Sequence, residues 1–426
     1  MKEKILVITT YPPKGSLHNH PYSAVAPYSK KTLLSSMEKE KKLKFVVLAD
    51  KLDGGKEEYF EDKIKVKRVW DRNKPKLFLQ IVREILKERN CLKVFFAFEW
   101  AIFGNKRYLL AGVPALLLFL RLMQKKVYFV SHGILTDANL AVEQLGIKKD
   151  SFRAKAYTLA LKTLYFLGVN LSHKTVAFEE ILRNHALQFT SDRSKVVTIS
   201  LGVEPNGRTS KRKEALSRVK LKEMRIKESD FVVLCFGFLT WYKGSDWLVK
   251  TLSHYFSKNK KTNIKLIMAG GPAKTHEEDR VYKKFIAAIY KCAKKAGKNI
   301  EITGFINEEN INDFFSLSDV VILPYRIFVS SSGPLSIAFS YKKPVLFSEP
   351  LSAYCLSLDI KEALEKSNLK MEEIIFSLDS KDLFKKLKEV SESKVLQGKM
   401  KKFSKIMSEK RSWSAIGEKY AYLLNG

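Results

Sequence analysis

Short apolar runs alternate with amphipathic stretches through the first half of this chain. The runs have the length of buried strands, and the stretches between them repeat apolar residues every three to four positions, as helices do. This alternation predicts a parallel sheet with helices on both faces, which is one Rossmann-like unit. We expect strands at 4–11, 45–48, 64–69, 92–98, 127–131, 174–177 and 196–199, and helices at 22–39, 77–87, 108–123 and 152–167.

The same rhythm begins again at residues 231–346. The apolar run 231–236 ends in Gly237, and Lys243-Gly244 then opens an amphipathic helix. Later runs end in AGGP, TGFI and PYR, and three serines and a glycine follow at 330–333. Ligands of parallel sheets bind outside the carboxyl ends of the strands, where these residues fall. A phosphate-bearing ligand is therefore the first functional expectation.

Residues 205–230 interrupt the rhythm with a proline, a glycine and many charges, which favours a domain boundary. A chain of 426 residues also exceeds the usual size of one compact domain. Beyond residue 346 the alternation weakens, and helices are expected at 381–390 and 400–424. We expect an N-terminal Rossmann-like domain at 1–205, a second at 206–396, and C-terminal helices at 397–426.

The chain is strongly basic. It has 77 lysines and arginines against 45 acidic residues, a formal charge of +32. Such an excess favours an anionic partner, which could be nucleic acid, an anionic membrane surface or a phosphorylated substrate, and a solvated lysine-rich surface is the plainer alternative. The basic residues are spread along the chain, and no aromatic RNA-binding strand accompanies them, so nucleic acid is not the expected partner.

The cysteines and the N-terminus indicate a cytoplasmic protein. Cys91, Cys235, Cys292 and Cys355 lie far apart, with no metal-binding spacing, and we expect reduced, packed thiols. No secretory signal opens the chain. The longest apolar stretch, 108–120, is too short to cross a bilayer and predicts a buried helix, with an interfacial helix between basic residues as the alternative.

Two common phosphate-binding motifs are absent. The first strand runs into TTYPPKGS, which lacks the GxGxxG fingerprint of dinucleotide oxidoreductases. Lys243 is followed by Gly244, so the Walker pattern and its magnesium-binding hydroxyl are missing as well. The phosphate-binding expectation therefore needs another kind of site.

A series of segments, in order along nearly the whole chain, resembles the GT-B glycosyltransferases of family 4, the glycosyl transferases group 1. FGFLTWYKG (236–244) is similar to the family's FGFxxPYKG, and SDVVILPYR (318–326) is similar to DVVxLPYR. The other similar segments are YPPKGSLHNH (11–20), FEWAIFG (98–104), SHGIL (131–135), VVTISLGVE (196–204), LIMAGGP, ITGFI and RSWSAIGEKYAYLL (411–424).

The resemblance implies a fold and a reaction. The fold would be GT-B, two Rossmann-like doubly wound domains facing across a cleft, with an acceptor domain first, a nucleotide-sugar domain second and the last helices crossing back. The reaction would be retaining transfer of a hexose from a nucleotide-diphosphate sugar to a glycan or lipid-linked acceptor. No metal and no cofactor beyond this co-substrate are implied. An anionic surface at the inner face of the membrane remains an open partner.

The donor site follows from the same segments. Negative charge grows on the diphosphate as the glycosidic bond breaks, and Lys243 at a helix start could stabilise it, as the resemblance implies. Arg326 could add a second cation, although a surface arginine is an alternative. The small-residue turn Ser331, Ser332 and Gly333 could hold phosphate oxygens, or could be a plain helix cap. The remaining expected donor contacts are Gly237, Gly270, Thr303, Gly304 and Phe305.

The first domain supplies the rest of the expected site. His132 ends a strand, and the resemblance implies that it binds the donor sugar and is catalytic with Lys243; a core histidine is the alternative. Glu99 also ends a strand, where a carboxylate is rarely buried unpaired, so it could orient a sugar hydroxyl or an active-site cation, or simply pair with a lysine or arginine. Gly15 and His18 are expected on the acceptor side.

One feature departs from the family's pattern. Many members carry a Glu-x7-Glu motif across the serine turn, and Val329 and Ile337 stand at these positions here. Neither side chain can bind a sugar hydroxyl. This leaves two alternatives to a glycosyltransferase: a non-catalytic GT-B-like binding subunit and, less favoured, a basic nucleic-acid-binding protein.

Overall fold

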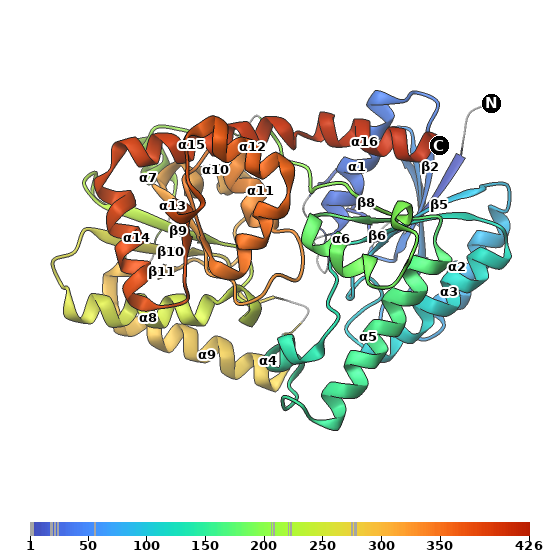
Figure 1. Cartoon of the computed structure of the whole chain (residues 1–426), viewed down its shortest axis with the longest axis horizontal. Coiled ribbons are helices and arrows are strands. Elements are labelled where there is room, and N and C mark those ends of the chain that lie inside the picture. The colour runs from blue at the N-terminus through green and yellow to red at the C-terminus, as the bar shows by residue number, and fades with distance from the viewer. Residues whose placement is uncertain are drawn as a thin grey trace.

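The computed structural model of the chain describes residues 4–17, 20, 23, 25–54, 57–205, 207, 209–219, 221, 224–273, 276 and 279–426. Two α/β lobes lie side by side, as Figure 1 shows. Each lobe is built on its own mainly parallel sheet, so the predicted pair of Rossmann-like domains is confirmed.

The N-terminal lobe holds a sheet of eight strands among the described residues, in the order β3-β4-β2-β1-β5-β6-β7-β8. Alternate residues of β1 enter two separate cores, Ile5 and Val7 on one face and Leu6 and Ile8 on the other. Such a strand is buried on both faces because helices cover both. The strands are β1 (Lys4–Ile8), β2 (Lys44–Asp50), β3 (Glu58–Glu61), β4 (Ile64–Trp70), β5 (Lys93–Phe98), β6 (Lys126–Ser131), β7 (Lys174–Ala177) and β8 (Val196–Thr198).

One strand of this sheet was not predicted. β3 pairs with β4 in an antiparallel hairpin at the sheet edge. The turn uses Asp62 and Lys63, both with positive φ, at 49° and 68°. Two consecutive positive φ values suit the twist of a tight hairpin, but the usual Asn-Gly or Asp-Gly signal is missing, which explains the omission.

Helices cover both faces of the first sheet. The apolar stretch at 108–120 begins as a 3₁₀ turn, η1 (Arg107–Ala111), and becomes helical at Gly112, where a β-carbon would lie 2.2 Å from the Phe78 ring. Its inner side is buried, as expected, and no helix in the described part of the chain has the length and apolar character that crossing a bilayer requires. The helices are α1 (Val25–Lys39), α2 (Leu77–Lys87), α3 (Gly112–Leu122), α4 (Val142–Leu145), α5 (Phe152–Leu171) and α6 (Glu180–Leu187).

The described residues after 230 form a parallel sheet of six strands in the order β11-β10-β9-β12-β13-β14. The strand order reverses between β9 and β12, which is the position where doubly wound sheets bind ligands. The residues that follow these two strands are therefore where a ligand site is expected. The strands are β9 (Phe231–Phe236), β10 (Ile264–Ala269), β11 (Ile300–Ile302), β12 (Val320–Leu323), β13 (Val345–Ser348) and β14 (Ile375–Phe376).

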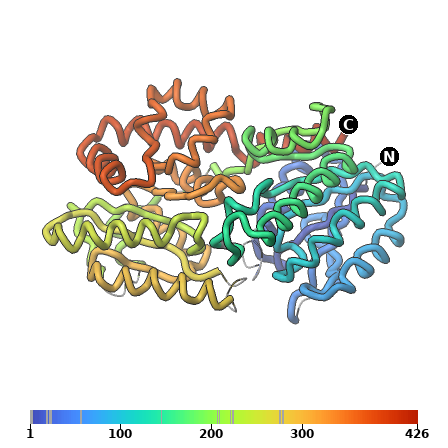
Figure 2. The backbone as a smooth tube through the Cα atoms, turned by 60° about the horizontal axis from the view of Figure 1, so that its bottom comes forward, coloured from blue at the N-terminus to red at the C-terminus, as the bar shows by residue number. Residues whose placement is uncertain are grey.

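Helices also cover both faces of the second sheet. In Figure 2 the yellow and amber α8 and α9 lie on one side of the lobe, and the red helices lie on the other. The interrupting segment before β9 holds a short helix, α7 (Arg212–Arg218). The others are α8 (Ser245–Lys258), α9 (Arg280–Lys295), α10 (Glu308–Leu317), α11 (Gly333–Ser340), α12 (Leu358–Ser367), α13 (Met371–Ile374), α14 (Ser380–Glu392) and α15 (Lys394–Lys410).

The chain returns to the first lobe through α16 (Trp413–Asn425), which lies against α1 (Figure 1). The expected helix at 400–424 is divided, because α15 ends at Lys410 and the Ser412 side chain caps α16 by accepting from the Ala415 N–H. At this break Val203 donates to the Arg411 carbonyl at 2.7 Å and accepts from Trp413 at 3.1 Å. The chain passes between the lobes twice, near Val203 and near Arg411, and these two crossing segments pair with each other.

Candidate functional site

The loops after two strands, one from each lobe, meet at the centre of the molecule. Gly133 follows β6 and forms an isolated antiparallel bridge with Ser330, in the loop before α11. The adjacent Ile134 N–H donates to the Val329 carbonyl at 3.2 Å. A β-carbon on Gly133 would lie 2.9 Å from that oxygen, so the close approach needs glycine. The site is therefore built where the lobes touch.

Lys243 directs its ammonium group toward the start of α11. It follows β9 by a short loop, in the 3₁₀ turn η4 (Trp241–Lys243). A β-carbon on Gly237 would lie 3.2 Å from Lys243 Nζ and 3.2 Å from the Pro334 ring, which brings the three residues together. Among the described residues no oxygen accepts a hydrogen bond from Nζ, which lies 5.8 Å from the centre of the Tyr242 ring. An unpaired cation here suits an anionic ligand.

The serine turn is held by contacts with both lobes. The Ser331 hydroxyl donates to Glu179 Oε1 at 2.9 Å. The Ser332 hydroxyl accepts from the Leu335 N–H as the cap of α11 and bonds the Tyr325 hydroxyl at 2.8 Å. These two side chains are engaged within the protein, as the helix-cap alternative expects for Ser332.

Gly333, the last residue of the serine turn, has free space beside its α-carbon. A β-carbon there would have no heavy atom within 4 Å. As the first residue of α11, its N–H has no acceptor within the helix. A free amide at a helix N-terminus, beside the unpaired Lys243, is an arrangement that suits phosphate oxygens.

The ends of β9, β10 and β11 pack closely against one another. A β-carbon on Gly270 would lie 2.1 Å from the Gly237 carbonyl oxygen, so the contact admits only glycine. The Thr303 hydroxyl bonds the Gly304 carbonyl at 2.9 Å. The Phe305 side chain is 67% exposed beside this contact, and its ring is free to stack on a ligand base.

Arg326 does not offer a second unpaired cation. Its guanidinium forms a bidentate pair with Asp246, at 2.7 and 2.8 Å. It also donates to the Trp241 carbonyl at 2.7 Å and lies 5.0 Å from the centre of that ring. Its charge is balanced inside the lobe by Asp246, so Arg326 is neither an unpaired second cation nor a plainly solvated surface arginine.

His132 lies next to the contact between the lobes. Its ring packs edge-on against Tyr28, at 4.5 Å between ring centres, and Phe178, at 4.8 Å. Burial lowers the pKa of His132 to about 3, so the imidazole is neutral at pH 7. Its Nε2 is buried and has no hydrogen-bond partner among the described residues. Such a group is costly unless a ligand completes it.

The expected acceptor-side residues occupy the first lobe. Gly15 adopts a φ of 77° and donates its N–H to Glu61 at 2.7 Å. His18 lies outside the described residues. Glu99 accepts from the Ala101 N–H at 2.9 Å, and burial raises the pKa of its carboxyl group. The charge of Arg72 opposes that shift, but the ion pair that the structure shows for Arg72 is with Asp50, at 3.4 Å.

A hollow opens between the lobes at a second place. A cavity of about 80 Å³ lies between Glu143 and Gly146 of the first lobe and Trp241, Tyr282 and Phe285 of the second. Figure 1 shows α4 and α9 approaching each other there. The described residues contain no group of three or more His, Cys, Asp or Glu that could hold a metal ion. Their four cysteines are free.

The sequence reasoning missed a buried ionic cluster beside the serine turn. Arg411 pairs with Glu179 at 2.6 and 2.9 Å and with Asp359 at 2.7 Å. Burial opposes the charge of Arg411, but the two carboxylates raise its pKa well above the usual range. Glu179 comes two residues after β7, so the rule applied to Glu99 could have found it.

Comparisons with known proteins agree with this geometry. Residues 230–356 match the family model of the glycosyl transferases group 1. No sequence among the curated proteins matches the chain.

Among solved structures, sucrose-phosphate synthase from Thermosynechococcus elongatus is similar with a TM-score of 0.71 and 11% identity, covering 99% of this chain and 98% of that one. Anabaena HepE in complex with UDP-glucose is similar with a TM-score of 0.64 and 13% identity, over 99% of both chains. WaaG, a glycosyltransferase involved in lipopolysaccharide biosynthesis, has a TM-score of 0.62 and 13% identity, over 99% of this chain and 100% of that one. The chain therefore has the GT-B fold, with a glycosyl transferases group 1 match in its second lobe, and these findings together support a glycosyltransferase.

Proposed function

We propose that the protein is a retaining glycosyltransferase that moves a hexose from a UDP-sugar to a glycan or lipid-linked acceptor. The observation that carries the proposal is the unpaired ammonium of Lys243, set against Gly237 and the start of α11 at the reversal point of the second sheet. The choice of UDP rests on similar structures, because HepE has been solved with UDP-glucose.

The chemistry needs a stabilised leaving group. When the bond between the sugar C1 and the phosphate oxygen breaks, its electron pair stays on the diphosphate. Lys243 and the free N–H of Gly333 would bind the oxygens that gain this charge. The acceptor hydroxyl forms the new bond to C1, and its proton passes to the departing diphosphate oxygen, so the step balances. Water must be kept out, and the contact between Gly133 and Ser330 already joins the two lobes beside the site.

His132 fits a role on the sugar. A neutral imidazole with an unpartnered buried Nε2 can complete its hydrogen bonding with a sugar hydroxyl. Its position next to Gly133 places it in the first lobe, opposite the loop that precedes α11. We assign no catalytic nucleophile.

The direct test is turnover of UDP-hexoses by the purified protein, with Lys243→Ala and Lys250→Ala compared. Both changes remove one positive charge near α8, but Lys250 is exposed on the helix. Loss of a group that stabilises transition-state charge costs about 10²–10³ in kcat, so Lys243→Ala should fall by that factor and Lys250→Ala should not. A folded protein that neither binds nor hydrolyses any UDP-, GDP- or ADP-hexose would contradict the proposal.

A non-catalytic binding subunit is the second candidate. The Val329 carbonyl is used in the bridge between the lobes, and Ile337 packs against the core of the second lobe. Neither can replace a carboxylate of the Glu-x7-Glu pattern. If the protein is such a subunit, UDP-sugars should raise its melting temperature without being turned over. Lys243→Ala should then make this rise smaller and have no other effect.

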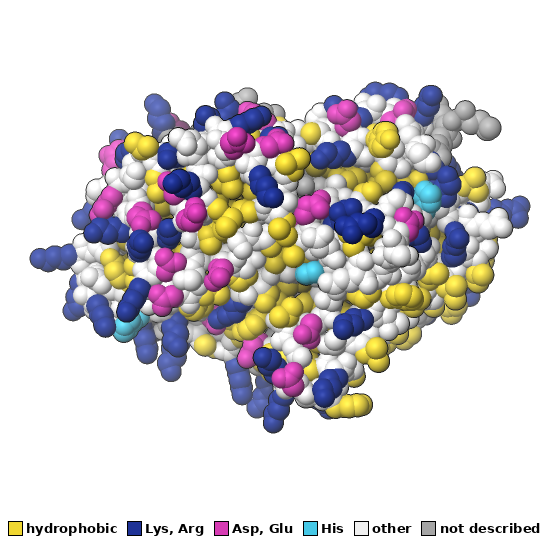
Figure 3. All heavy atoms as spheres, in the orientation of Figure 1, with side chains coloured by type: hydrophobic (Ala, Val, Ile, Leu, Met, Phe, Trp, Pro, Cys, Tyr) yellow, Lys and Arg dark blue, Asp and Glu magenta, His cyan; other side chains and the backbone are white. Residues whose placement is uncertain are grey.

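We also propose that the first lobe acts at the inner face of the cytoplasmic membrane. Leu118 and Leu122 on α3 and Phe152 and Leu159 on α5 are exposed, at 48%, 74%, 85% and 68%. In Figure 3 hydrophobic side chains gather over the region of α2 and α3. Basic residues on the same two helices, among them Arg121, would attract anionic lipid.

Vesicle co-sedimentation tests this attachment. Binding should require anionic lipid, weaken with added salt, and fall when Leu118 and Leu122 are both changed to Ser. Equal binding to neutral and anionic vesicles, or binding to nucleic acid with a steep salt dependence and none to vesicles, would contradict it.

A further inference from the structure

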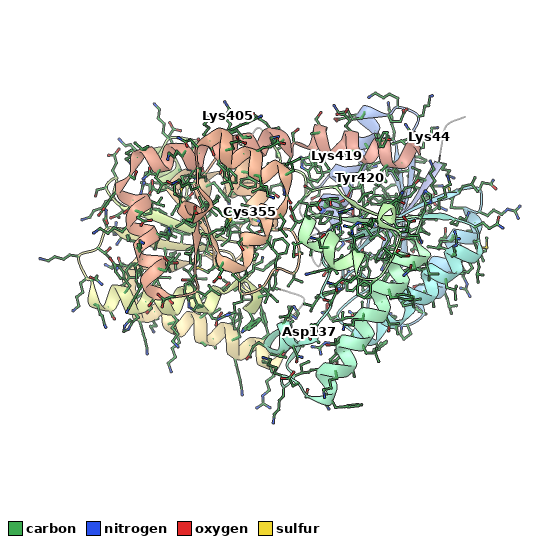
Figure 4. All side chains as sticks on the ribbon, viewed as in Figure 1. Lys44, Asp137, Cys355, Lys405, Lys419 and Tyr420 are labelled. Carbon is green, nitrogen blue, oxygen red and sulfur yellow. The ribbon has the colours of Figure 1, made fainter. Side chains whose placement is uncertain are left out.

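A second basic site lies on the C-terminal lobe, apart from the residues described above. It is a surface hollow of about 710 Å³, lined by Lys342, Lys343, Lys401, Lys402, Lys405 and Tyr341. Three distant parts of the chain form it: the segment between the lobes, the end of α11 and the outer side of α15. Figure 4 shows Lys405 pointing outward from α15.

Two of the lysines are fixed by backbone oxygens. Lys342 adopts a φ of 51°, unusual for a residue with a side chain, and its Nζ donates to the Pro205 carbonyl at 3.0 Å. Lys343 donates to the Ser318 carbonyl at 2.8 Å. Neutral carbonyls orient these ammonium groups without cancelling their charge.

The other three lysines are unpaired. Among the described residues, the side chains of Lys401, Lys402 and Lys405 have no hydrogen-bond or ion-pair partner. Their neighbours on α15 differ, because Lys399 pairs with Glu373 and Lys410 pairs with Glu362. Lys401, Lys402 and Lys405 therefore lack the acidic partners that α12 and α13 give to Lys410 and Lys399.

The interior of the hollow is also short of negative charge. Asp319 is the carboxylate that acts on Lys343, and it is already engaged by Arg212 at 3.1 Å and by the Val232 N–H at 2.7 Å. Burial, opposed by Asp319 and helped by Lys401 and Arg212, lowers the pKa of Lys343 to about 8. Burial therefore disfavours the charged form of Lys343, and an anion bound next to it would favour that form again.

We propose that this hollow, the Lys342/Lys401 hollow, binds a polyanionic ligand that carries two or more linked phosphate groups. Its volume is within the range of small-molecule sites, and its lysines act as separate point charges suited to several phosphates. The presence of Lys342 and Lys343 could be explained by the negative C-terminal end of the α11 dipole alone. This dipole does not explain Lys401, Lys402 and Lys405, because they lie along α15.

The site is separate from the proposed donor site. Gly333 begins α11, whereas Lys342 and Lys343 follow its end, so the eight-residue helix sets the two sites roughly 12 Å apart along its axis. Binding at the hollow can therefore occur whether or not the protein transfers sugar.

Calorimetric titration of the full chain with inorganic tripolyphosphate tests the proposal. The variants are Lys401→Ala/Lys402→Ala/Lys405→Ala, its Lys→Arg counterpart, and a control triple, Lys381→Ala/Lys385→Ala/Lys388→Ala, at exposed positions of α14. All titrations are repeated on the Lys243→Ala background, which weakens phosphate binding at the donor site.

The hollow triple should lose at least tenfold in affinity, while the Lys→Arg variant and the control triple keep it within about threefold. The same pattern should hold on the Lys243→Ala background. Equal losses of tripolyphosphate affinity in both alanine triples would mean that the anion binds to basic surface in general and not to the hollow, which would overturn the proposal. Binding that disappears with Lys243→Ala alone would assign the phosphate to the donor site and would overturn it too.

Discussion

Arg411 and Glu179 lie 232 positions apart, and their side chains form a buried bidentate ion pair. Arg411 stands between the last two helices, and Glu179 belongs to the first lobe. Arg411 also pairs with Asp359 of the second lobe at 2.7 Å, and Ser331 donates to Glu179. One guanidinium thus links the first lobe, the second lobe and the serine turn.

Arg411→Met should lower the free energy of unfolding by about 3–5 kcal/mol, because it leaves the fully buried Glu179 carboxylate, and the partly buried Asp359 carboxylate, without their partner. Urea titration measures the loss. Lys410→Met is the matched control: the adjacent residue carries the same charge, and its pair with Glu362 is partly exposed, so about 1 kcal/mol or less is expected. Similar losses in both variants would mean that the buried cluster contributes nothing beyond a surface pair.

Local patterns predicted most of the framework. The strand 231–236, the turn at Gly237 and the helix after Lys243 followed from periodicity and turn chemistry, and the structure places Lys243 beside Gly237 as the strand-end rule implies. The helix over 77–87 and the strand over 174–177 agree in both bounds. These elements depend on short-range order, which a sequence displays directly.

The rest depended on contacts between distant residues. The break at Arg411 is fixed by pairing with Val203, and its one local signal, the capping Ser412, does not by itself divide an otherwise helical stretch. The partners of Ser331 and Arg326 likewise lie far along the chain, at Glu179 and Asp246. Their place at strand ends and the family resemblance suggested these side chains as candidate anion ligands, and only the packed fold shows that protein carboxylates engage them.

Two glycines of the proposed donor site should differ in their response to alanine. Gly270→Ala would bring a β-carbon to 2.1 Å from the Gly237 carbonyl, so the strand ends must move apart and the melting temperature should fall by several degrees. Gly333→Ala meets no atom and adds a residue that favours helices, so stability should be unchanged.

The functional effect of Gly333→Ala is different. If donor phosphates occupy the open space at the start of α11, the added methyl group should weaken UDP binding at least tenfold while the fold stays intact. Thermal melting and calorimetric titration with UDP measure the two effects. Unchanged UDP affinity would place the phosphates elsewhere.

His132 should remain neutral throughout the range where histidines usually titrate. Its pKa is lowered by burial to about 3, against about 6.5 in an unfolded chain. Between these values the unfolded state binds more protons, so stability is fully present above pH 6.5 and is lost as the pH falls toward 3. Relative to His132→Gln, the wild-type protein should lose stability over this window, and its His132 proton resonance should not shift between pH 8 and 5. A titration of the His132 chemical shift with a midpoint near pH 6.5 would contradict the lowered pKa.

Lys343 should make stability depend on alkaline pH. Burial lowers its pKa from 10.5 to about 8, with Lys401 and Arg212 adding to the shift and Asp319 opposing it. Between pH 8 and 10.5 the unfolded chain holds the proton that the folded chain has released, so this residue makes stability rise with pH. Compared with Lys343→Met, the wild-type protein should gain up to about 3 kcal/mol in its free energy of unfolding across this window, measured by urea titration at several pH values.

Tripolyphosphate bound in the Lys342/Lys401 hollow would stabilise the charged form of Lys343, so its addition should move the rise in stability to higher pH. The same rise at the same pH with and without tripolyphosphate would mean that the anion does not reach Lys343.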